Sequence, residues 1–304
     1  MNIDHLREFS FLADSLNFSA TAKHFFLSQS VLSKHIAAME DELHTKLFER
    51  NSHKVSLTEQ GKIFQKDASY IVRRYDCAVT HLRCLEEGYT ANLDICYLRG
   101  ASRPFLHLFL SKMRKYAPEV HVNLRCCEFW EIRLSLGSQN PDLVFSMDFF
   151  PEAHEVYRVE PLYTDRFDAV ARPDHPIHKE LVDGYVSLES LKDKLILLPD
   201  EASYGNMATF IQEFLPNDLP EKNLDFYPDV DTAMLRVHSS DRIGFSSEHN
   251  IPLYRDLVDF MPLAGVDTSY EVSAFISKDD KRPELQTCNE IIEELQRYMK
   301  NHHW

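Results

Sequence analysis

The stretch Phe18-Ser-Ala-Thr-Ala-Lys-His-Phe-Phe-Leu-Ser-Gln-Ser-Val-Leu-Ser-Lys-His-Ile-Ala-Ala-Met-Glu-Asp-Glu-Leu-His-Thr-Lys-Leu-Phe-Glu-Arg50 decides the fold of this chain. Its apolar spacing predicts two short helices joined by a tight turn, with a polar face on the second helix. Helices arranged in this way can place the second one in the major groove of DNA. The sequence on either side must therefore complete a small helical head.

The flanking residues supply that head. Apolar residues at helical spacing predict a first helix over about residues 4–16. Ser19 stands where an N-cap would open a second helix, and Ser28 where one would open a third, which reaches about Leu43. Residues 50–58 alternate and are rich in polar side chains, which predicts a two-stranded wing with a turn near residues 51–53.

The third helix has a polar face of small side chains that can approach base edges closely. Amides can pair with adenine, and hydroxyls and lysines with several edges or with phosphate, while the caps favour phosphate. A surface helix pair without DNA affinity remains the alternative interpretation. The candidate DNA-binding residues are Ser19, Ser28, Gln29, Ser30, Ser33, Lys34 and Lys54.

A heptad pattern follows the head and ends at Gly88, which is typical of a helix stop. One long helix with such a stripe must bury it, and a second copy of the chain is the simplest partner. Packing on its own body is the alternative. Cys77 and Cys84 fall outside the stripe, so we expect them to face solvent. The candidate dimerisation residues are Phe64, Ala68, Ile71, Tyr75, Ala78, Leu82 and Leu85.

From residue 91 onward the pattern alternates between strands and helices. Two successive βαβαβ runs predict parallel sheets with right-handed crossovers, and an amphipathic helix over about residues 283–299 follows them. Two α/β lobes with a cleft between them are the expected architecture. The predicted fold is thus an α+β multidomain chain: a winged helix-turn-helix, a long linker helix and a two-lobed α/β domain.

The charge distribution separates the head from the body. The net charge is −15, yet residues 1–66 hold eight Lys and Arg against eight Asp and Glu, so the body carries the whole excess. Phosphates would repel that acidic body, whereas the head could face DNA. The sequence shows neither a signal peptide nor an apolar run of membrane length, which favours the cytoplasm. Six cysteines without a C-x-x-C pair favour free thiols, with a redox sensor as the alternative.

The complete set of motifs resembles the LysR-type transcriptional regulators. It comprises Phe18-Ser19-x-x-Ala22, Leu27-Ser28-Gln29-Ser30-x-Leu32-Ser33, Glu40-x-Glu42-Leu43, Leu47-Phe48-Glu49-Arg50 and Leu57-Thr58-x-x-Gly61. Ser30 stands where that family usually has Pro, and Val31 where it has Ala. The residues Ser239-Ser240-Asp241-Arg242 replace a turn that is usually rich in glycine, so the cleft is expected to be atypical there.

This resemblance implies a division of the chain into three parts. These are a winged helix-turn-helix over 1–58, a dimerising linker helix over 59–88, and an effector-binding domain over 89–304 like the type 2 periplasmic binding proteins. Lobe I would take about 89–162 with 269–304, and lobe II about 163–268. Homodimers assembling as tetramers on double-stranded DNA, with RNA polymerase as a further partner, are the implied assembly.

The resemblance also places a small-molecule effector between the lobes, near strand ends and helix starts. Ser102 at a helix start could hold an anionic group and Arg103 could pair with it. The alternatives are that Ser102 only caps a helix while Arg103 is solvated, or that the cleft holds no ligand. The candidate effector-binding residues are Gly100, Ala101, Ser102, Arg103, Ser146, Met147, Ser203, Gly244 and Phe245.

No catalytic motif stands out in the sequence. It contains no G-x-S-x-G, H-E-x-x-H, Walker or G-x-G-x-x-G pattern, and its histidines lack ligand spacing. We therefore expect neither enzyme activity, nor a metal, nor a cofactor. Two other readings stay open: a solute-binding or catalytic α/β protein with an accessory helical head, and a constitutive DNA-binding protein whose second domain only oligomerises.

Overall fold

The structure is a computed structural model that describes residues 1–50, 55–86, 88–137, 141–216, 218–278, 280 and 282–301. The chain divides into two compact units, Met1–Asn92 and a second that spans Leu93–Gly137 with Pro141–Trp304. None of the helices in the described residues is both long and apolar enough to cross a membrane. The fold class expected from the sequence is confirmed by the elements of these two units and by their likeness to solved proteins described below.

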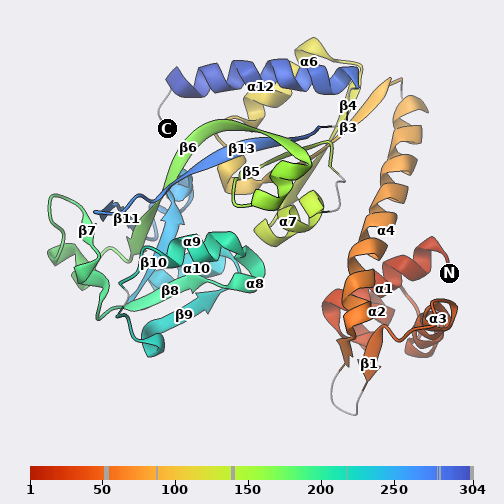
Figure 1. Ribbon diagram of the computed structural model, residues 1–304, viewed down its shortest axis with the longest axis horizontal. Helices are drawn as coiled ribbons and strands as arrows, with labels where there is room; N and C mark the ends of the chain where they lie inside the picture. The colour runs from red at the N-terminus through yellow and green to blue at the C-terminus, as the bar shows by residue number, and fades with distance from the viewer. Residues whose placement is uncertain are drawn as a thin grey trace. The chain divides into compact units, whose positions relative to one another are not determined.

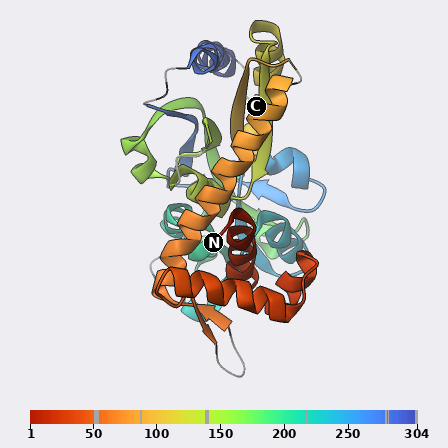
Figure 2. The same ribbon diagram turned by 90° about the vertical axis from the view of Figure 1, so that its right-hand side faces the viewer.

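The first unit contains the helical head. Its elements are α1 (Ile3–Ser15), α2 (Phe18–His24), α3 (Gln29–Glu42), β1 (Phe48–Arg50), β2 (Val55–Leu57) and α4 (Glu59–Glu86). β1 and β2 pair antiparallel as a two-stranded wing, with Phe48 opposite Leu57. The first three helices gather about the N-terminal part of α4, and the rest of this helix continues beyond them (Figures 1 and 2).

Polar side chains determine where the head helices begin. Asn2 and Asn17 accept hydrogen bonds from the backbone N–H groups of His5 and Ala20, and Ser28 accepts one from Val31. Each such bond satisfies an amide that a helix start would otherwise leave unpaired. The prediction that Ser28 caps the third helix is confirmed. The prediction that Ser19 caps the second is wrong, because Asn17 performs this role and Ser19 lies one residue inside α2.

The head has its own apolar core, which explains how three short helices hold together. Each helix contributes the side chains of one face, and α4 and the wing close the cluster. The buried members are Leu6, Phe9, Leu12, Ala13, Phe18, Ala22, Leu32, Ile36, Met39, Leu47, Phe48 and Ala68.

The second unit is a two-lobed α/β domain. Lobe I begins with β3 (Ala91–Leu98), α5 (Arg99–Ser102), α6 (Leu106–Tyr116), β4 (Val120–Cys127), α7 (Phe129–Gly137), β5 (Leu143–Met147) and η1 (Pro151–Glu155). β3 and β5 are parallel, as a βαβ order requires. The chain returns to this lobe at its end in α12 (Pro283–Asn301), which packs beside α6 (Figure 1).

Lobe II contains the middle of the chain. Its elements are η2 (Pro176–Lys179), β7 (Val186–Ser187), η3 (Glu189–Leu191), β8 (Leu195–Pro199), α8 (Glu201–Tyr204), α9 (Asn206–Gln212), η4 (Glu221–Asn223), β9 (Leu224–Tyr227), α10 (Val230–His238), β10 (Arg242–Ser247), η5 (Glu248–Asn250), α11 (Ile251–Tyr254), β11 (Asp259–Met261) and β12 (Leu263–Ala264). β8 lies between β9 and β10 and is parallel to both.

Two long strands join the lobes. β6 (Tyr157–Ala171) pairs antiparallel with β13 (Ser269–Ser277) along most of its length, and with β10 and β11 at its end. The two strands run side by side from one lobe to the other (Figure 1). The sheet is therefore mixed, in the order β4-β3-β5-β13-β6-β10-β8-β9, and the purely parallel sheets expected from the sequence are a wrong prediction. The crossing strands hold the two lobes against each other and place the ends of several strands near the junction.

Candidate functional site

The predicted DNA-reading residues gather at the start of α3. Ser28, Gln29, Ser30 and Lys34 are exposed there, and Ser33 is half-buried. The Ser19 hydroxyl of α2 donates to Oε1 of Gln29 at 3.3 Å, and the hydroxyls of Ser28 and Ser30 lie 2.9 Å apart. Lys54, the candidate in the wing, lies outside the described residues.

The opposite side of α3 packs in the head core and so determines which way the polar face points. Leu32, Ile36 and Met39 have no exposed surface and pack in the head core. A helix held by one apolar side leaves its other side free for a partner. The polar side chains at the start of α3 therefore lie on the side of the helix that faces away from the head core.

A buried carboxylate ties the C-terminal end of α3 to the wing. The Glu40 side chain is 5% exposed, and its Oε1 accepts hydrogen bonds from the backbone N–H groups of Leu47 at 2.9 Å and Phe48 at 3.2 Å. Lys46 donates to its Oε2 at 2.7 Å. Burial alone would raise the pKa of Glu40, but these three hydrogen bonds outweigh it and the pKa is lowered. The first strand of the wing is thus anchored to α3.

The predicted dimerisation residues fall into two groups along α4. Ala68 is fully buried in the head core and Phe64 packs against it. Farther along, Ile71, Tyr75 and Leu82 are 43%, 49% and 65% exposed.

Ala78 is also exposed, whereas the side chain of Leu85 lies outside the described part. The expectation that Cys84 faces solvent is wrong, because it is 3% exposed and its thiol donates to Oδ1 of Asn92 at 3.9 Å.

The second unit contains a cavity of about 580 Å³ where its two lobes meet. The loops that follow β3, β4, β9 and β10 contribute to it, which is the general location of ligand sites in open α/β sheets. Its volume lies within the range of small-molecule sites. The lining residues are Leu98, Arg99, Gly100, Cys127, Glu128, Phe129, Met147, Phe167, Tyr204, Met207, Tyr227, Asp229, Val230, Asp231, Phe245, Ser246, Ser247, His249, Asn250, Leu253 and Tyr254.

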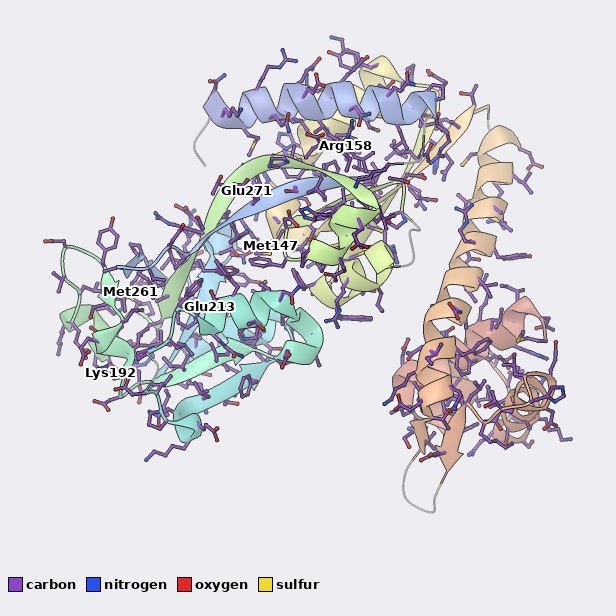
Figure 3. The ribbon with its side chains drawn as sticks, in the orientation of Figure 1. Met147, Arg158, Lys192, Glu213, Met261 and Glu271 are labelled. Atoms are coloured by element: carbon purple, nitrogen blue, oxygen red, sulfur yellow. The ribbon has the colours of Figure 1, made fainter. Side chains whose placement is uncertain are left out.

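Three of the predicted effector residues line this cavity: Gly100, Met147 and Phe245. Met147 lies where β5 ends and is labelled in Figure 3. The others lie outside the lining. Ala101 and Ser146 have no exposed surface, Gly244 is buried in β10 and Ser203 lies in α8.

Ser102 and Arg103 do not share a site. Ser102 ends α5 rather than starting a helix, has no exposed surface, and its hydroxyl donates to the carbonyl oxygen of Phe145 at 3.4 Å. Arg103 lines a second cavity of about 1180 Å³ with His107 and Lys300. The expectation that Ser102 opens a helix is wrong, because α5 ends there and α6 begins only at Leu106.

A hydrogen-bonded cluster separates the two cavities. His249 lines both of them, and its Nδ1 lies 2.5 Å from Oδ2 of Asp165. The Tyr270 hydroxyl donates to the same Asp165 oxygen at 2.8 Å. The side chains of His249 and Asp165 are only 6% and 4% exposed. These residues from η5, β6 and β13 brace the junction of the lobes.

Charged residues that the sequence analysis missed surround the first cavity. They are Arg99 after β3, Glu128 after β4, and Asp229 and Asp231 at the start of α10. Burial raises the pKa of Glu128, Arg99 opposes this rise, and Glu131, Asp229 and Asp231 reinforce it. Their place shortly after β3, β4 and β9 is the sequence signal that could have found Arg99, Glu128 and Asp229.

Two family models match the chain over most of its length. The model described as bacterial regulatory helix-turn-helix protein, lysR family, matches residues 3–62, and the LysR substrate binding domain matches residues 86–295. The chain belongs to the LysR family. It is a LysR-type DNA-binding transcriptional regulator with an effector-binding domain, so the function expected from the sequence is confirmed.

Curated relatives include two transcriptional regulators of Escherichia coli. The Hca operon transcriptional activator HcaR of Escherichia coli (strain K12) is 25% identical over 305 residues, covering 97% of this chain and 98% of that protein. The uncharacterized HTH-type transcriptional regulator YbhD of the same strain is 26% identical over 235 residues, covering 75% of this chain and 69% of that protein.

Solved LysR-type structures share the fold. The crystal structure of CbnR, a LysR family transcriptional regulator, has a TM-score of 0.66 at 18% identity and covers 97% of this chain and 99% of that one. Full-length CbnR complexed with its target DNA has a TM-score of 0.64 at 19% identity, covering 97% and 100%. At this identity the likeness shows a shared architecture for the LysR-type chain.

Proposed function

We propose that this regulator is a cytoplasmic protein that reads double-stranded DNA with the start of α3. The exposed surface of Ser28, Gln29, Ser30 and Lys34 carries the proposal, because amides and hydroxyls there can bond to base edges in the major groove. Ser19 joins this surface through its bond to Gln29. Lys54 of the wing remains a proposed phosphate contact. CbnR, which shares this fold, has been solved in complex with its target DNA, and this supports DNA as the proposed partner.

Dimers of this chain form through α4 in the same proposal. Ile71, Tyr75 and Leu82 follow the heptad spacing and are exposed in a single copy of the chain. A second copy would cover them, and pairs of dimers would then place four heads on half-sites about one or two helical turns apart. RNA polymerase at the promoter is a further proposed partner.

The cavity between the lobes is the proposed effector site, with Gly100, Met147 and Phe245 among its walls. A ligand held there touches both lobes and so favours one of their arrangements over others. Because β6 and β13 join the lobes, such a preference extends through the whole domain and alters the spacing of the heads on DNA. An anion held by Ser102 and Arg103 together is not part of this proposal, since the two side chains have no common cavity. We assign no catalytic role to the cavity.

Binding of DNA fragments from the organism that encodes the protein tests the central claim. Fluorescence anisotropy of the full-length protein should show salt-dependent binding, with a specific fragment preferred over bulk DNA. Replacing Gln29 and Ser33 with Ala should cost about 1–3 kcal/mol per lost base contact. A matched control, Gln212→Ala, removes an exposed amide from α9 in the second unit and should bind normally. Failure to bind any double-stranded fragment at low salt would refute the proposal.

A further inference from the structure

The charges of the cavity between the lobes define the chemical class of its ligand, on the premise that this cavity is the effector site. We propose that the effector is an organic cation, with an amine or ammonium group on an apolar body. Three carboxylates line the cavity, from Glu128, Asp229 and Asp231, against the single guanidinium of Arg99. The other titratable base in the lining, His249, has its Nδ1 bonded to the buried Asp165 carboxylate.

None of the three carboxylates forms a salt bridge within the described part of the chain. One Asp229 oxygen accepts the backbone N–H of Thr232 at 2.8 Å, which caps α10. Asp231 accepts a hydrogen bond from the phenol of Tyr254. Both bonds come from neutral donors, and the carboxylate of Glu128 has none from the residues described. Arg99 is the one guanidinium in the lining and interacts with Glu128 and Asp231, so three carboxylates face one fixed cation and the cavity wall keeps an excess of negative charge.

The carboxylates come from both lobes, so a ligand that pairs with them touches both. Glu128 lies between β4 and α7 in lobe I, whereas Asp229 and Asp231 lie at the start of α10 in lobe II. Burial is the main cause of the raised pKa of Glu128, Arg99 opposes it, and the two aspartates across the junction add a smaller repulsion. A cation between them would replace this repulsion with attraction and draw the lobes together.

Aromatic side chains complete the site for a cation on an apolar body. Tyr204 and Tyr227 are 5% and 3% exposed, line the cavity, and their ring centroids lie 5.6 Å apart. Neither phenol has a hydrogen-bond partner among the described residues, so each can accept an N–H of a ligand. Phe129 lies 5.8 Å from the Tyr204 ring. The electron-rich faces of such rings attract cations, while Phe167 and Phe245 provide an apolar wall.

Two other classes of ligand fit the cavity less well. An anion would find one guanidinium, whose neighbours are the thiol of Cys126 and the carboxylates of Glu128 and Asp231. A bare metal ion needs several ligands around one point, and no group of three or more His, Cys, Asp or Glu within the described ranges is placed to hold one. The cavity of about 580 Å³ also exceeds the needs of an ion and suits a molecule of small-ligand size.

Matched ligand pairs test the proposal on the full-length protein. The first pair is 2-phenylethylamine and 3-phenylpropionate, the second is hexylamine and heptanoate, and 2-phenylethanol is the neutral control. At about 10 mM, an amine with a dissociation constant of about 1 mM should raise the melting temperature of the protein by about 2–4 °C. The ligands 3-phenylpropionate, heptanoate and 2-phenylethanol should leave the melting temperature unchanged. The proposal is overturned if 3-phenylpropionate or heptanoate gives a larger shift than its matched amine, or if neither amine raises the melting temperature.

Neutralising the three protein carboxylates of the cavity should change its preference from amines to carboxylate ligands. The triple variant Glu128→Gln, Asp229→Asn, Asp231→Asn keeps an acceptor for Thr232 and for Tyr254, because Asn also caps helices. It should lose the shift caused by the amines and gain one with 3-phenylpropionate, since Arg99 remains. The control variant Glu213→Gln, Glu221→Gln, Asp256→Asn removes the same number of exposed carboxylates outside the cavity and should respond like the wild type. An undiminished amine shift in the first variant contradicts the proposal.

DNA binding separates this inference from the proposed function. If the wild-type protein binds its DNA but neither amine changes its melting temperature, the cationic effector alone is refuted. Protein that is stabilised by an amine yet binds no DNA would refute the DNA-reading role and leave the cation site standing. The amine should also change the apparent DNA affinity, measured by anisotropy, in the wild type and not in the triple carboxylate variant.

Discussion

A Cβ atom on Gly61 would lie 2.1 Å from the backbone carbonyl oxygen of Leu47. This contact explains why a glycine stands in the first turn of α4, where the helix meets the start of the wing. Thr58 holds the two segments together: its N–H donates to the carbonyl oxygen of Leu47 at 3.0 Å, and its hydroxyl donates to that of Lys46 at 2.7 Å. The position of the wing depends on this close approach.

The variant Gly61→Ala should therefore destabilise the head by about 3 kcal/mol, because backbone atoms must shift to admit the methyl group. In an unobstructed helix the same change stabilises by about 0.5–1 kcal/mol. Gly137→Ala is the control, since nothing lies within 4 Å of its added Cβ. Urea unfolding measures both. Equal free energies of unfolding for Gly61→Ala and wild type would contradict the predicted clash.

Removal of the Glu40 carboxylate should loosen the wing. In Glu40→Ala the buried N–H groups of Leu47 and Phe48 lose their acceptor, which should cost about 1–3 kcal/mol. Loss of DNA affinity should accompany this, because the wing is no longer fixed to α3. Thermal unfolding and anisotropy measure the two effects. Lys62→Ala, which removes an exposed ion pair with Glu59, should change stability little.

The same carboxylate should make the head sensitive to acid. The pKa of Glu40 is lowered in the folded protein, so its stabilising contribution is complete above the unfolded pKa of about 4.5. This contribution is lost as the pH falls through the folded pKa, because protonation weakens the bonds from Lys46 and the wing amides. Between neutral pH and pH of about 3, wild-type stability should fall more than that of Glu40→Gln. If the stability of the two proteins falls equally with pH, ionised Glu40 does not contribute to the stability of the head.

A charge in the exposed stripe of α4 should separate the proposed dimer. Ile71→Glu places a carboxylate where a second copy would bury an apolar side chain, and sedimentation equilibrium should then show monomers. Ile63→Glu is the matched control, because Ile63 is 66% exposed on the same helix but lies outside the heptad positions. An intact dimer in Ile71→Glu, or monomers in both variants, would argue against the assigned stripe.

Phe26 occupies the turn between α2 and α3 with a positive φ of 56° and is 97% exposed. A left-handed backbone costs a residue with a large side chain about 1 kcal/mol or more, whereas Asn adopts it readily. Phe26→Asn should therefore raise the stability of the head by about 0.5–1 kcal/mol, as measured by the melting temperature. Ile63→Asn, at an exposed site with ordinary helical backbone, should bring no gain. A destabilised Phe26→Asn would show that the ring makes contacts of its own.

The head could be predicted from the sequence because its structure depends on residues close together in the chain. The spacing of Leu32, Ile36 and Met39 determines which side of α3 is buried, and Ser28 begins the helix at the expected place. The cap of α2 lies two residues before the predicted one, because Asn17 and Ser19 are both good caps. Local signals compete at such a boundary, and only the final packing selects one.

The effector cavity could not be read from local patterns. Arg99, Glu128 and Asp229 are far apart in the chain, and the order of the strands brings the loops that carry them to one junction. The sequence alone determined the family, the order of the main elements and which side of α3 is buried, since periodicity and capping act within a few residues. Only the tertiary structure decided that Ser102 is buried, that Arg103 lines another cavity, and that the cavity between the lobes is lined by three carboxylates. Burial and charge at such a site depend on which distant segments the sheet places side by side.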